Sequence, residues 1–439
     1  MIINVSDVGK SNSCLVAITV ILCSLFLGCA SYTEETRQVR VYYQDQQYAK
    51  ALKELEDSSV KSQARNRLLY ALERALILDK MNKRRQSRAL LIEADKIADE
   101  LYTVSVSKTA TSFLLNDSTT DYSGEDYEKV AIHIMLALSF IEDGEYESAQ
   151  VSARKINHKL LEINQHYEKG KNRYGEDAFA RYLSGIIFEA RGDWDDALID
   201  YKKALDLYDG GYNLFHRGGI PESLVKAYYK LALLRERSGV AAKLLKAYPS
   251  ILKGYDKKLE KMSDWGELVV IHRVGHIAVK TNEEFVLPVG RQIVRFSFPV
   301  IKPKTHFWGR YDKTGVEVEQ EQFFAAENLQ NFSQIASKTL EDRRGRLLLK
   351  GAARLIAKGQ LTEAAYDKFG PLGGLLANIY SAVSETGDTR GWTLLPDELF
   401  ITRVPLKPGK HKISIKSLDR LMDLKTIEIR KRKILILSE

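Results

Sequence analysis

The hydrophobic pattern divides the chain into two parts. Over residues 48–262, apolar side chains recur every three or four positions, the spacing that places them on one face of a helix. Beyond this part, the stretches 266–288 and 291–301 alternate or run apolar, are rich in β-branched residues and contain proline near their ends. The sequence therefore predicts a mainly α-helical part followed by a C-terminal α+β domain with antiparallel strands.

The C-terminal domain, residues 263–439, is predicted to contain a long helical segment as well as strands. Residues 322–385 have a helical pattern, whereas residues 392–418 and 424–437 have strand-like patterns. After a Lys-Pro-Gly turn, lysines occupy one phase of the strand pattern and isoleucines the other, which predicts a strand exposed on one face.

Residues 181–208 carry the clearest helical hairpin of the first part. Two small residues, Gly185 and Ala197, let two antiparallel helices approach closely. Gly192 suits the left-handed turn that ends the first helix, and Asp193 is placed to cap the second. The aromatic residues expected to fill the seam between the helices are Phe188, Trp194 and Tyr201.

This hairpin resembles a tetratricopeptide repeat (TPR), whose 34-residue helix–turn–helix pattern it follows at seven positions. Similar hairpins are predicted within residues 61–102, 129–164 and 221–248. The expected turn residues of these hairpins are Asn82, Gly144 and Gly239. The resemblance implies a TPR-like α-solenoid of four or five hairpins over residues 48–262.

The N-terminus has the pattern of a bacterial lipoprotein leader. An apolar run over residues 15–27 is too short to span a bilayer comfortably and ends in Gly28-Cys29. This junction resembles a lipobox, which implies a signal peptide over residues 1–28 and a diacylated Cys29 as the mature N-terminus. The alternatives are a plain secretory signal or an uncleaved anchor with an incidental cysteine.

The cysteine distribution agrees with lipidation. All three cysteines precede residue 30, so the mature body has no thiol for a disulfide, a metal site or a nucleophile. No Asp follows Cys29, which by the sorting rule of enteric-type lipoproteins indicates the outer membrane. Palmitate and a second acyl chain anchor a protein stably. Residues 29–47 are then expected to form a polar tether.

Composition indicates a globular body and gives little support for nucleic-acid binding. Hydrophobic residues make up 44% and charged residues 28%, and the formal charge is +8. One dense basic cluster, Arg430 to Lys433, precedes an apolar stretch. It is interpreted as a charge-protected edge strand, or alternatively as a contact for lipopolysaccharide, anionic lipid or peptidoglycan.

Four candidate motifs for chemistry have structural interpretations. His272 and His276 are four residues apart but flanked by strand patterns, which favours structural histidines over metal ligands. Gly370–Gly374 lacks the Lys of a phosphate loop and predicts a tight helix start. The helix that follows is expected to be buried, the alternative being a membrane-dipping helix. Trp392 is expected to lock its loop onto the β domain, the alternative being a binding surface with Arg390.

In TPR arrays the first helix of each hairpin lines the concave face, so the apolar residues there are candidates for binding a partner. If the C-terminal domain or a neighbouring helix covers them, the groove is closed. The predicted partner-binding residues are Ile134, Leu138, Ile141, Phe179, Tyr182, Ile186 and Glu189.

As a whole, the chain resembles an uncharacterised group of bacterial TPR-containing outer-membrane lipoproteins. The resemblance rests on the lipobox, the helix NRLLYALERA, the repeat FEARGDWDDALIDYKKAL and the closing TRGWTLLPDELFITRVPLKPGKHKISI. The resemblance brings no established biochemistry. The lipobox predicts a lipid-anchored periplasmic protein, and the concave face of the solenoid predicts that it binds a protein or peptide partner, without catalysis or a cofactor, in cell-envelope or peptidoglycan assembly. The alternative is a hydrolase acting on cell-wall or surface polymer through the C-terminal domain.

Overall fold

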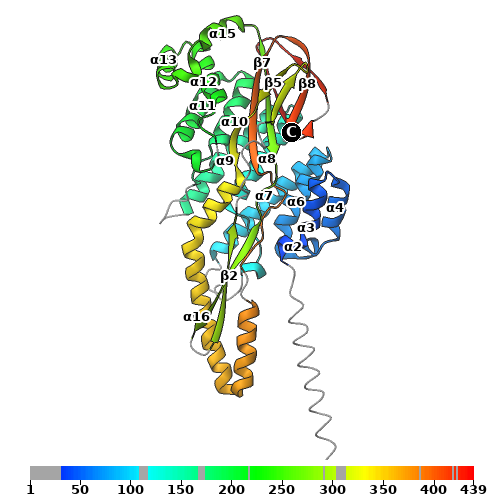
Figure 1. Cartoon of the computed structure of the whole chain (residues 1–439), viewed down its shortest axis with the longest axis vertical. Helices are drawn as coiled ribbons and strands as arrows, with labels where there is room; N and C mark the ends of the chain where they lie inside the picture. The colour runs from blue at the N-terminus through cyan, green and yellow to red at the C-terminus, as the bar shows by residue number, and fades with distance from the viewer. Residues whose placement is uncertain are drawn as a thin grey trace, which may run out of the picture.

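The computed structural model shows a helical solenoid followed by an α+β part with antiparallel strands, as the sequence predicts (Figure 1). The strands of the C-terminal part lie against the helical hairpins (Figure 1). The residues described by the structure are 31–107, 117–166, 174–215, 218–289, 292–302, 313–384, 387–417, 420–421 and 424–439.

Within these residues, the solenoid contains five helical hairpins. The paired helices are α3 (Arg37–Gln44) with α4 (Tyr48–Asp57), α6 (Arg67–Lys80) with α7 (Arg84–Ser107), α8 (Asp126–Glu142) with α9 (Tyr146–His166), α10 (Ala178–Arg191) with α11 (Trp194–Asp209), and α12 (Glu222–Leu234) with α13 (Ser238–Ala247). Short helices before, between and after them are α2 (Tyr32–Glu35), α5 (Ser59–Ser62), α14 (Pro249–Leu252) and α15 (Tyr255–Lys261).

Each hairpin turns at one residue in the left-handed conformation. The prediction holds for Asn82, whose φ is 59°, but not for Gly239, which lies inside α13. Because α12 ends at Leu234, the last hairpin turns earlier, at Glu236 with a φ of 53°. The left-handed turn residues of the five hairpins are Gln46, Asn82, Gly144, Gly192 and Glu236.

The central hairpin differs from the expected contacts in two details. Asp193 is the N-cap of α11, as predicted, but its carboxylate accepts a 3.0 Å bond from Arg191 rather than from the helix backbone. The atoms closest to a Cβ placed on Gly185 belong to the Tyr201 ring, at 2.5 and 2.6 Å. Gly185 therefore makes room for an aromatic ring.

The tether expected over residues 29–47 is largely helical and packs onto the body. Helices α2 and α3 occupy most of this segment, and Tyr32, Val39 and Tyr43 are buried. Tyr43 meets His276 edge to face, with ring centroids 5.4 Å apart. Three large apolar side chains at helical spacing give the segment a face to bury, despite its polar composition.

The strands form two sheets and a separate hairpin. The first sheet has the order β11-β1-β7-β6, and its pairs are antiparallel except for the parallel pair β1–β11. Its strands are β1 (Gly266–Val274), β6 (Glu327–Asn331), β7 (Glu398–Leu406) and β11 (Ile434–Ser438). The second sheet contains β4 (Gly315–Val318), β5 (Gln322–Ala325), β8 (Gly409–Ser417), β9 (Arg420–Leu421) and β10 (Lys425–Ile429), and the hairpin pairs β2 (Lys280–Val289) with β3 (Gln292–Ile301).

Two sequence expectations for this part are corrected. The helix expected from residue 322 begins only at Phe332, because β5 and β6 precede it and pair with other strands. The basic cluster Arg430–Lys433 is a turn between β10 and β11 rather than an edge strand. Arg432 has a φ of 55°, and its guanidinium lies 3.3 Å from Asp264. In β8, Ile413 and Ile415 are buried and Lys410 and Lys412 are exposed, as predicted, but Ser414 on the lysine face is buried as well.

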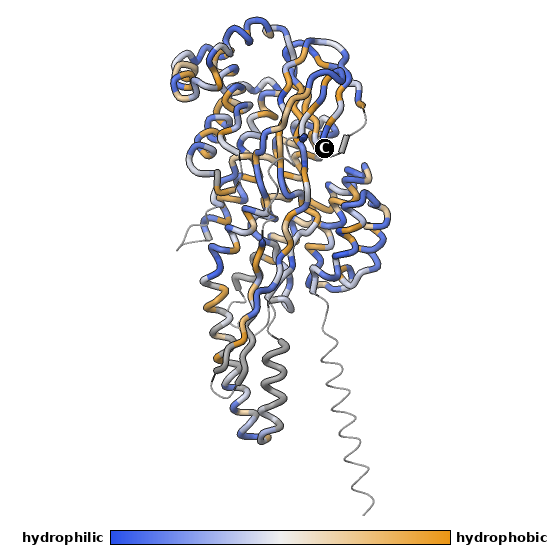
Figure 2. The backbone as a smooth tube through the Cα atoms, in the orientation of Figure 1, coloured by the Kyte–Doolittle hydropathy of each residue, from blue (hydrophilic) through white to orange (hydrophobic). Residues whose placement is uncertain are grey.

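Strand β1 is buried on both faces, which explains its continuous apolar run. Val269 and Ile271 belong to the large core shared with the helices, whereas Leu268 and Val270 belong to a smaller core between the two sheets. This division follows from the alternation of side chains along a strand. Figure 2 shows the hydrophobic residues gathered where strands meet helices.

Helix α16 (Phe332–Ser384) leaves the body and turns back at its far end (Figure 1). The turn lies at Gly370, which has φ 67° and ψ −163°, and Pro371 begins the returning helix. The tight helix start predicted there is confirmed. Residues 341–384 are called the arm below.

Candidate functional site

All seven residues predicted to bind a partner are buried. Glu189 is the most exposed of them, at 8%, and each of the others is at most 2% exposed. Six belong to the same hydrophobic cluster as Val269, Ile271 and Ile436 of the first sheet. Helices α8 and α10, which carry the seven, contact β11. The concave face of the solenoid is therefore filled by the chain's own sheet.

Buried ion pairs fasten the sheet to the solenoid at Glu189. Arg403 on β7 lies 2.9 Å from Glu189 and 2.7 Å from Glu267 of β1. Lys230 of α12 lies 2.8 Å from each of the same two carboxylates. Burial alone would raise the pKa of Glu189, but attraction to Lys230 and Arg403 outweighs it and holds the pKa below its usual range. Glu189 thus binds the protein's own sheet.

A second buried cluster joins β1 to the ends of α6 and α8. Arg273 is 8% exposed, and its guanidinium lies 2.6 Å from Asp79 and 2.9 Å from Glu142. Arg84, which is 31% exposed, reaches Glu142 from the outside at 2.7 Å. Glu142 therefore pairs with one buried cation, Arg273, and one partly exposed cation, Arg84.

The loop from residue 387 to 397 is held by two buried carboxylates of the solenoid. Glu73 of α6 accepts bonds from Thr393 N at 2.7 Å, Thr393 Oγ1 at 2.8 Å and Leu394 N at 3.0 Å. Glu128 of α8 accepts a 2.7 Å bond from Trp392 N. Trp392, 1% exposed, therefore locks the loop onto the solenoid rather than onto the β domain. The loop's backbone amides need acceptors once buried, and the helices supply them.

Arg390 of this loop is also used internally. Its guanidinium donates to Asp388 at 2.9 and 2.8 Å and to the carbonyl of Thr120 at 2.9 Å. It also lies over the Tyr122 ring, 5.2 Å from the centroid. Arg390 and Trp392 are both buried, so they do not form the exposed binding surface weighed as the alternative.

Glu73 has a pKa suited to acid–base chemistry but no access to a substrate. Burial raises its pKa to about 7, against the lowering effect of the hydrogen bonds from Thr393, Leu394 and Tyr32. Tyr32 of α2 donates to the same carboxylate at 3.0 Å. Both carboxylate oxygens are thus occupied by donors of the chain itself. Its role is to join the solenoid, the loop and the N-terminal helix.

The histidines of the sequence motif lie in and after a strand, as predicted. His272 is buried in β1, where its Nε2 lies 2.8 Å from Thr402 Oγ1, and burial lowers its pKa to about 4. His276 packs against Tyr43. Across the residues that the structure describes, no group of three or more His, Cys, Asp or Glu is placed to hold a metal ion.

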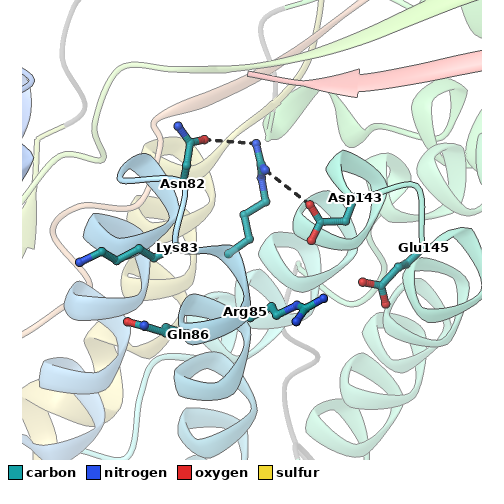
Figure 3. Close-up of a pocket in the computed structure, with 7 residues that line it drawn as sticks. Asn82, Lys83, Arg85, Gln86, Asp143 and Glu145 are labelled. Atoms are coloured by element: carbon teal, nitrogen blue, oxygen red, sulfur yellow. Dashed lines mark hydrogen bonds and ion pairs between the residues drawn. The ribbon is translucent and has the colours of Figure 1, made fainter.

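A hollow of about 550 Å³ lies at the turns of two neighbouring hairpins, α6–α7 and α8–α9 (Figure 3). Its lining is polar, and Arg84 pairs with Asn82 at 3.3 Å and with Asp143 at 3.4 Å. These internal pairs satisfy much of the charge at its centre. The residues that line it are Asn82, Lys83, Arg84, Arg85, Gln86, Asp143 and Glu145.

The predicted lipidation site, Cys29, lies outside the described residues. Over the described ranges, none of the helices combines the length and the apolar character needed to cross a membrane.

Sequence reasoning missed the residues that close the concave face. Glu73, Arg273 and Arg403 each interrupt an otherwise apolar stretch, in LLYALERALIL, LVVIHRV and LFITRVPL. A charge on an apolar face needs a buried partner. A charged residue within an apolar stretch therefore indicates an internal ion pair or hydrogen bond, although the sequence does not show which residue is its partner.

Comparisons with known proteins give a likeness to helical-repeat structures only. No family model matches the chain, and no curated protein matches its sequence. RapI in its apo form is 13% identical, with 52% of this chain and 73% of that one covered, at a TM-score of 0.35. The nearly identical TPR-like repeats of a Podosopora anserina kinesin light chain are 12% identical, with 51% of this chain and 95% of that one covered, at a TM-score of 0.33. MamA of AMB-1 is 14% identical, with 50% of this chain and 91% of that one covered, at a TM-score of 0.30. These similarities are too low to support a conclusion on function.

Proposed function

We propose that this protein is an outer-membrane lipoprotein, anchored through Cys29 on the periplasmic side, that acts as a non-catalytic scaffold in cell-envelope or peptidoglycan assembly. The observation that supports a scaffold role is that the chain's own sheet fills the concave face of the solenoid. In the described residues, solenoid and sheet share one hydrophobic core and are joined by buried ion pairs, so the chain's own side chains occupy the concave face. A rigid body with a filled groove presents its outer surface to partners.

The outer helices of the hairpins offer apolar side chains for such contacts. Val151 and Leu161 of α9 are 57% and 56% exposed, and Ile199 of α11 is 53% exposed. These helices follow α8 and α10, whose apolar residues face the sheet. A protein or peptide partner is therefore expected to bind the outer helices.

Lipidation is tested by metabolic labelling with palmitate. Cys29→Ala should abolish labelling and release the protein from the outer-membrane fraction, because no other cysteine stands at the lipobox. The matched control is Cys23→Ala, which lies in the leader and should leave labelling unchanged. Unchanged labelling of the Cys29 variant would refute the anchor.

Partner contact is tested by photocrosslinking in intact envelopes. A benzoylphenylalanine at Ile199 should crosslink to a partner protein, whereas the same group at buried Ile186 should crosslink only within the chain. A partner crosslink at Ile186 and none at Ile199 would mean that the concave groove opens in the cell.

A further inference from the structure

The arm carries apolar side chains that the body does not cover. Leu349 and Ile356, seven residues apart on α16, are 73% and 67% exposed, and Phe369 at the far turn is 67% exposed. Residues seven apart lie on the same face of a helix. Tyr366, 46% exposed, lies against Gly374 of the returning helix. The arm thus has an exposed apolar face and an aromatic tip.

Charge is unevenly distributed in the arm: the outgoing helix has a basic stretch bracketed by Glu341 and Asp342 on one side and by Glu363 and Asp367 on the other, and the returning helix is uncharged. From Arg343 to Lys358 the sequence has six basic and no acidic residues. From Phe369 to Ser384 it has no charged residue. Basic residues favour anionic headgroups, while aromatic and uncharged residues favour the boundary between headgroups and acyl chains.

The root of the arm lies beside the N-terminal helix. Thr33 of α2 donates to the carbonyl of Lys280, where β2 begins, at 3.4 Å, and to the carbonyl of Thr389, which follows the arm, at 3.3 Å. Arg343 and Lys280 both pair with Glu125 of the solenoid. In Figure 1, α2 lies at the end of the helical body from which the arm extends.

This placement brings the arm to the bilayer that holds the anchor. Thr33 is four positions after Cys29, and an extended chain of that length spans at most about 14 Å. The helix from Arg343 to Gly370 rises about 40 Å at 1.5 Å per residue. An arm longer than the tether and rooted beside it is long enough to reach the membrane surface.

From these observations we infer that the arm is a second membrane contact, lying in the interface of an anionic phospholipid bilayer with Leu349, Ile356 and Phe369 against the lipid. The inference rests on the proposed anchoring through Cys29. The arm is an interfacial element of the kind that dips roughly 5–10 Å into the headgroup region. It holds the scaffold in a fixed orientation, which a single flexible anchor does not.

The test uses the cysteine-free body for site-specific labelling of the acylated full chain. Phe369→Cys and Ile356→Cys, each carrying an environment-sensitive nitrobenzoxadiazole dye, are reconstituted in phosphatidylethanolamine–phosphatidylglycerol vesicles with a doxyl-labelled lipid. Both labels should be quenched severalfold more than a label at Leu234→Cys, which is 61% exposed on α12. Adding Phe369→Asp to the Ile356-labelled protein should at least halve the quenching, whereas adding Leu234→Asp should not.

The possible outcomes distinguish a failure of the membrane contact by the arm from a failure of the proposed lipid anchor. A chain that does not float with the vesicles is not anchored, and the proposed function fails. A chain that floats with its arm labels no more quenched than the Leu234 label overturns the membrane contact. Energy transfer between arm labels of different copies without lipid would also overturn it, because a second copy would then cover the arm. Quenching that disappears in purely zwitterionic vesicles would confirm the role of the basic residues.

Discussion

At the scale of residues, the fold depends on a few side chains that contact two different elements at the same time. Tyr201 is fully buried between α10 and the sheet, and its hydroxyl donates to Glu189 at 2.6 Å and accepts from Arg403 at 3.2 Å. Its ring edge lies where a side chain at Gly185 would stand. A ring held at both ends cannot move aside cheaply.

Gly185→Ala should therefore lower the free energy of unfolding by about 1–3 kcal/mol, the usual cost of overpacking a core. The measurement is a urea titration followed by far-ultraviolet circular dichroism. Gly239→Ala is the matched control, since Gly239 lies in helix α13 with no neighbouring atom within 4 Å of the added Cβ. The control should unfold at the same midpoint or slightly higher. A Gly185 variant as stable as wild type would contradict the close packing of the Tyr201 ring against Gly185.

At the scale of elements, strand β1 connects the parts of the molecule. It pairs with β7 and β11, buries side chains toward both the solenoid and the second sheet, and sends Arg273 to the ends of α6 and α8. Removing one member of a buried cluster leaves its partners charged and without full compensation. The connection between β1 and the helices is thus sensitive to a single side chain.

Arg273→Ala is expected to cost about 3–5 kcal/mol, because Asp79 then remains buried without its cation. Arg84→Ala, which removes the partly exposed cation from the same Glu142, should cost about 1 kcal/mol or less. Urea midpoints of the two variants give the comparison. Equal losses in both would mean that Arg273 contributes no more than a surface ion pair.

At the scale of the whole molecule, the solenoid and the C-terminal part are one body rather than two joined by a linker. One hydrophobic cluster extends from Tyr32 of α2 through the hairpins to Ile436 of β11. The loop carrying Trp392 returns from the arm and ends among α6 and α8. Solenoid and sheet are therefore expected to unfold together.

This cooperativity can be followed with Trp392 as the only tryptophan, after the other three are replaced by phenylalanine. Its fluorescence reports the docked loop, and circular dichroism at 222 nm reports the helices. The two urea transitions should coincide, as they do when a structure unfolds in one step. An early fluorescence transition with the helices intact would show that the solenoid is stable without the loop.

Local patterns in the sequence were enough to predict the helical hairpins, most of their turns and most strands of the C-terminal part, although not β5 and β6. These features depend on the period of apolar residues and on which residues tolerate a left-handed turn, and both are properties of short segments. The pattern also predicted which faces are buried. Gly239 shows the limit of this reasoning, because the end of an apolar run, rather than the glycine, positioned the turn.

The occupant of the concave face was decided only by the tertiary structure. An apolar stripe requires a cover but does not identify it, since a partner and the chain's own sheet bury the same surface equally well. Residues 32–44 and 322–331 changed from their expected states for the same reason, because their contacts come from distant segments. Glu189 was predicted to face a partner, and a residue 214 positions away, Arg403, became its partner instead. The sequence determined what had to be buried, and the fold determined against what.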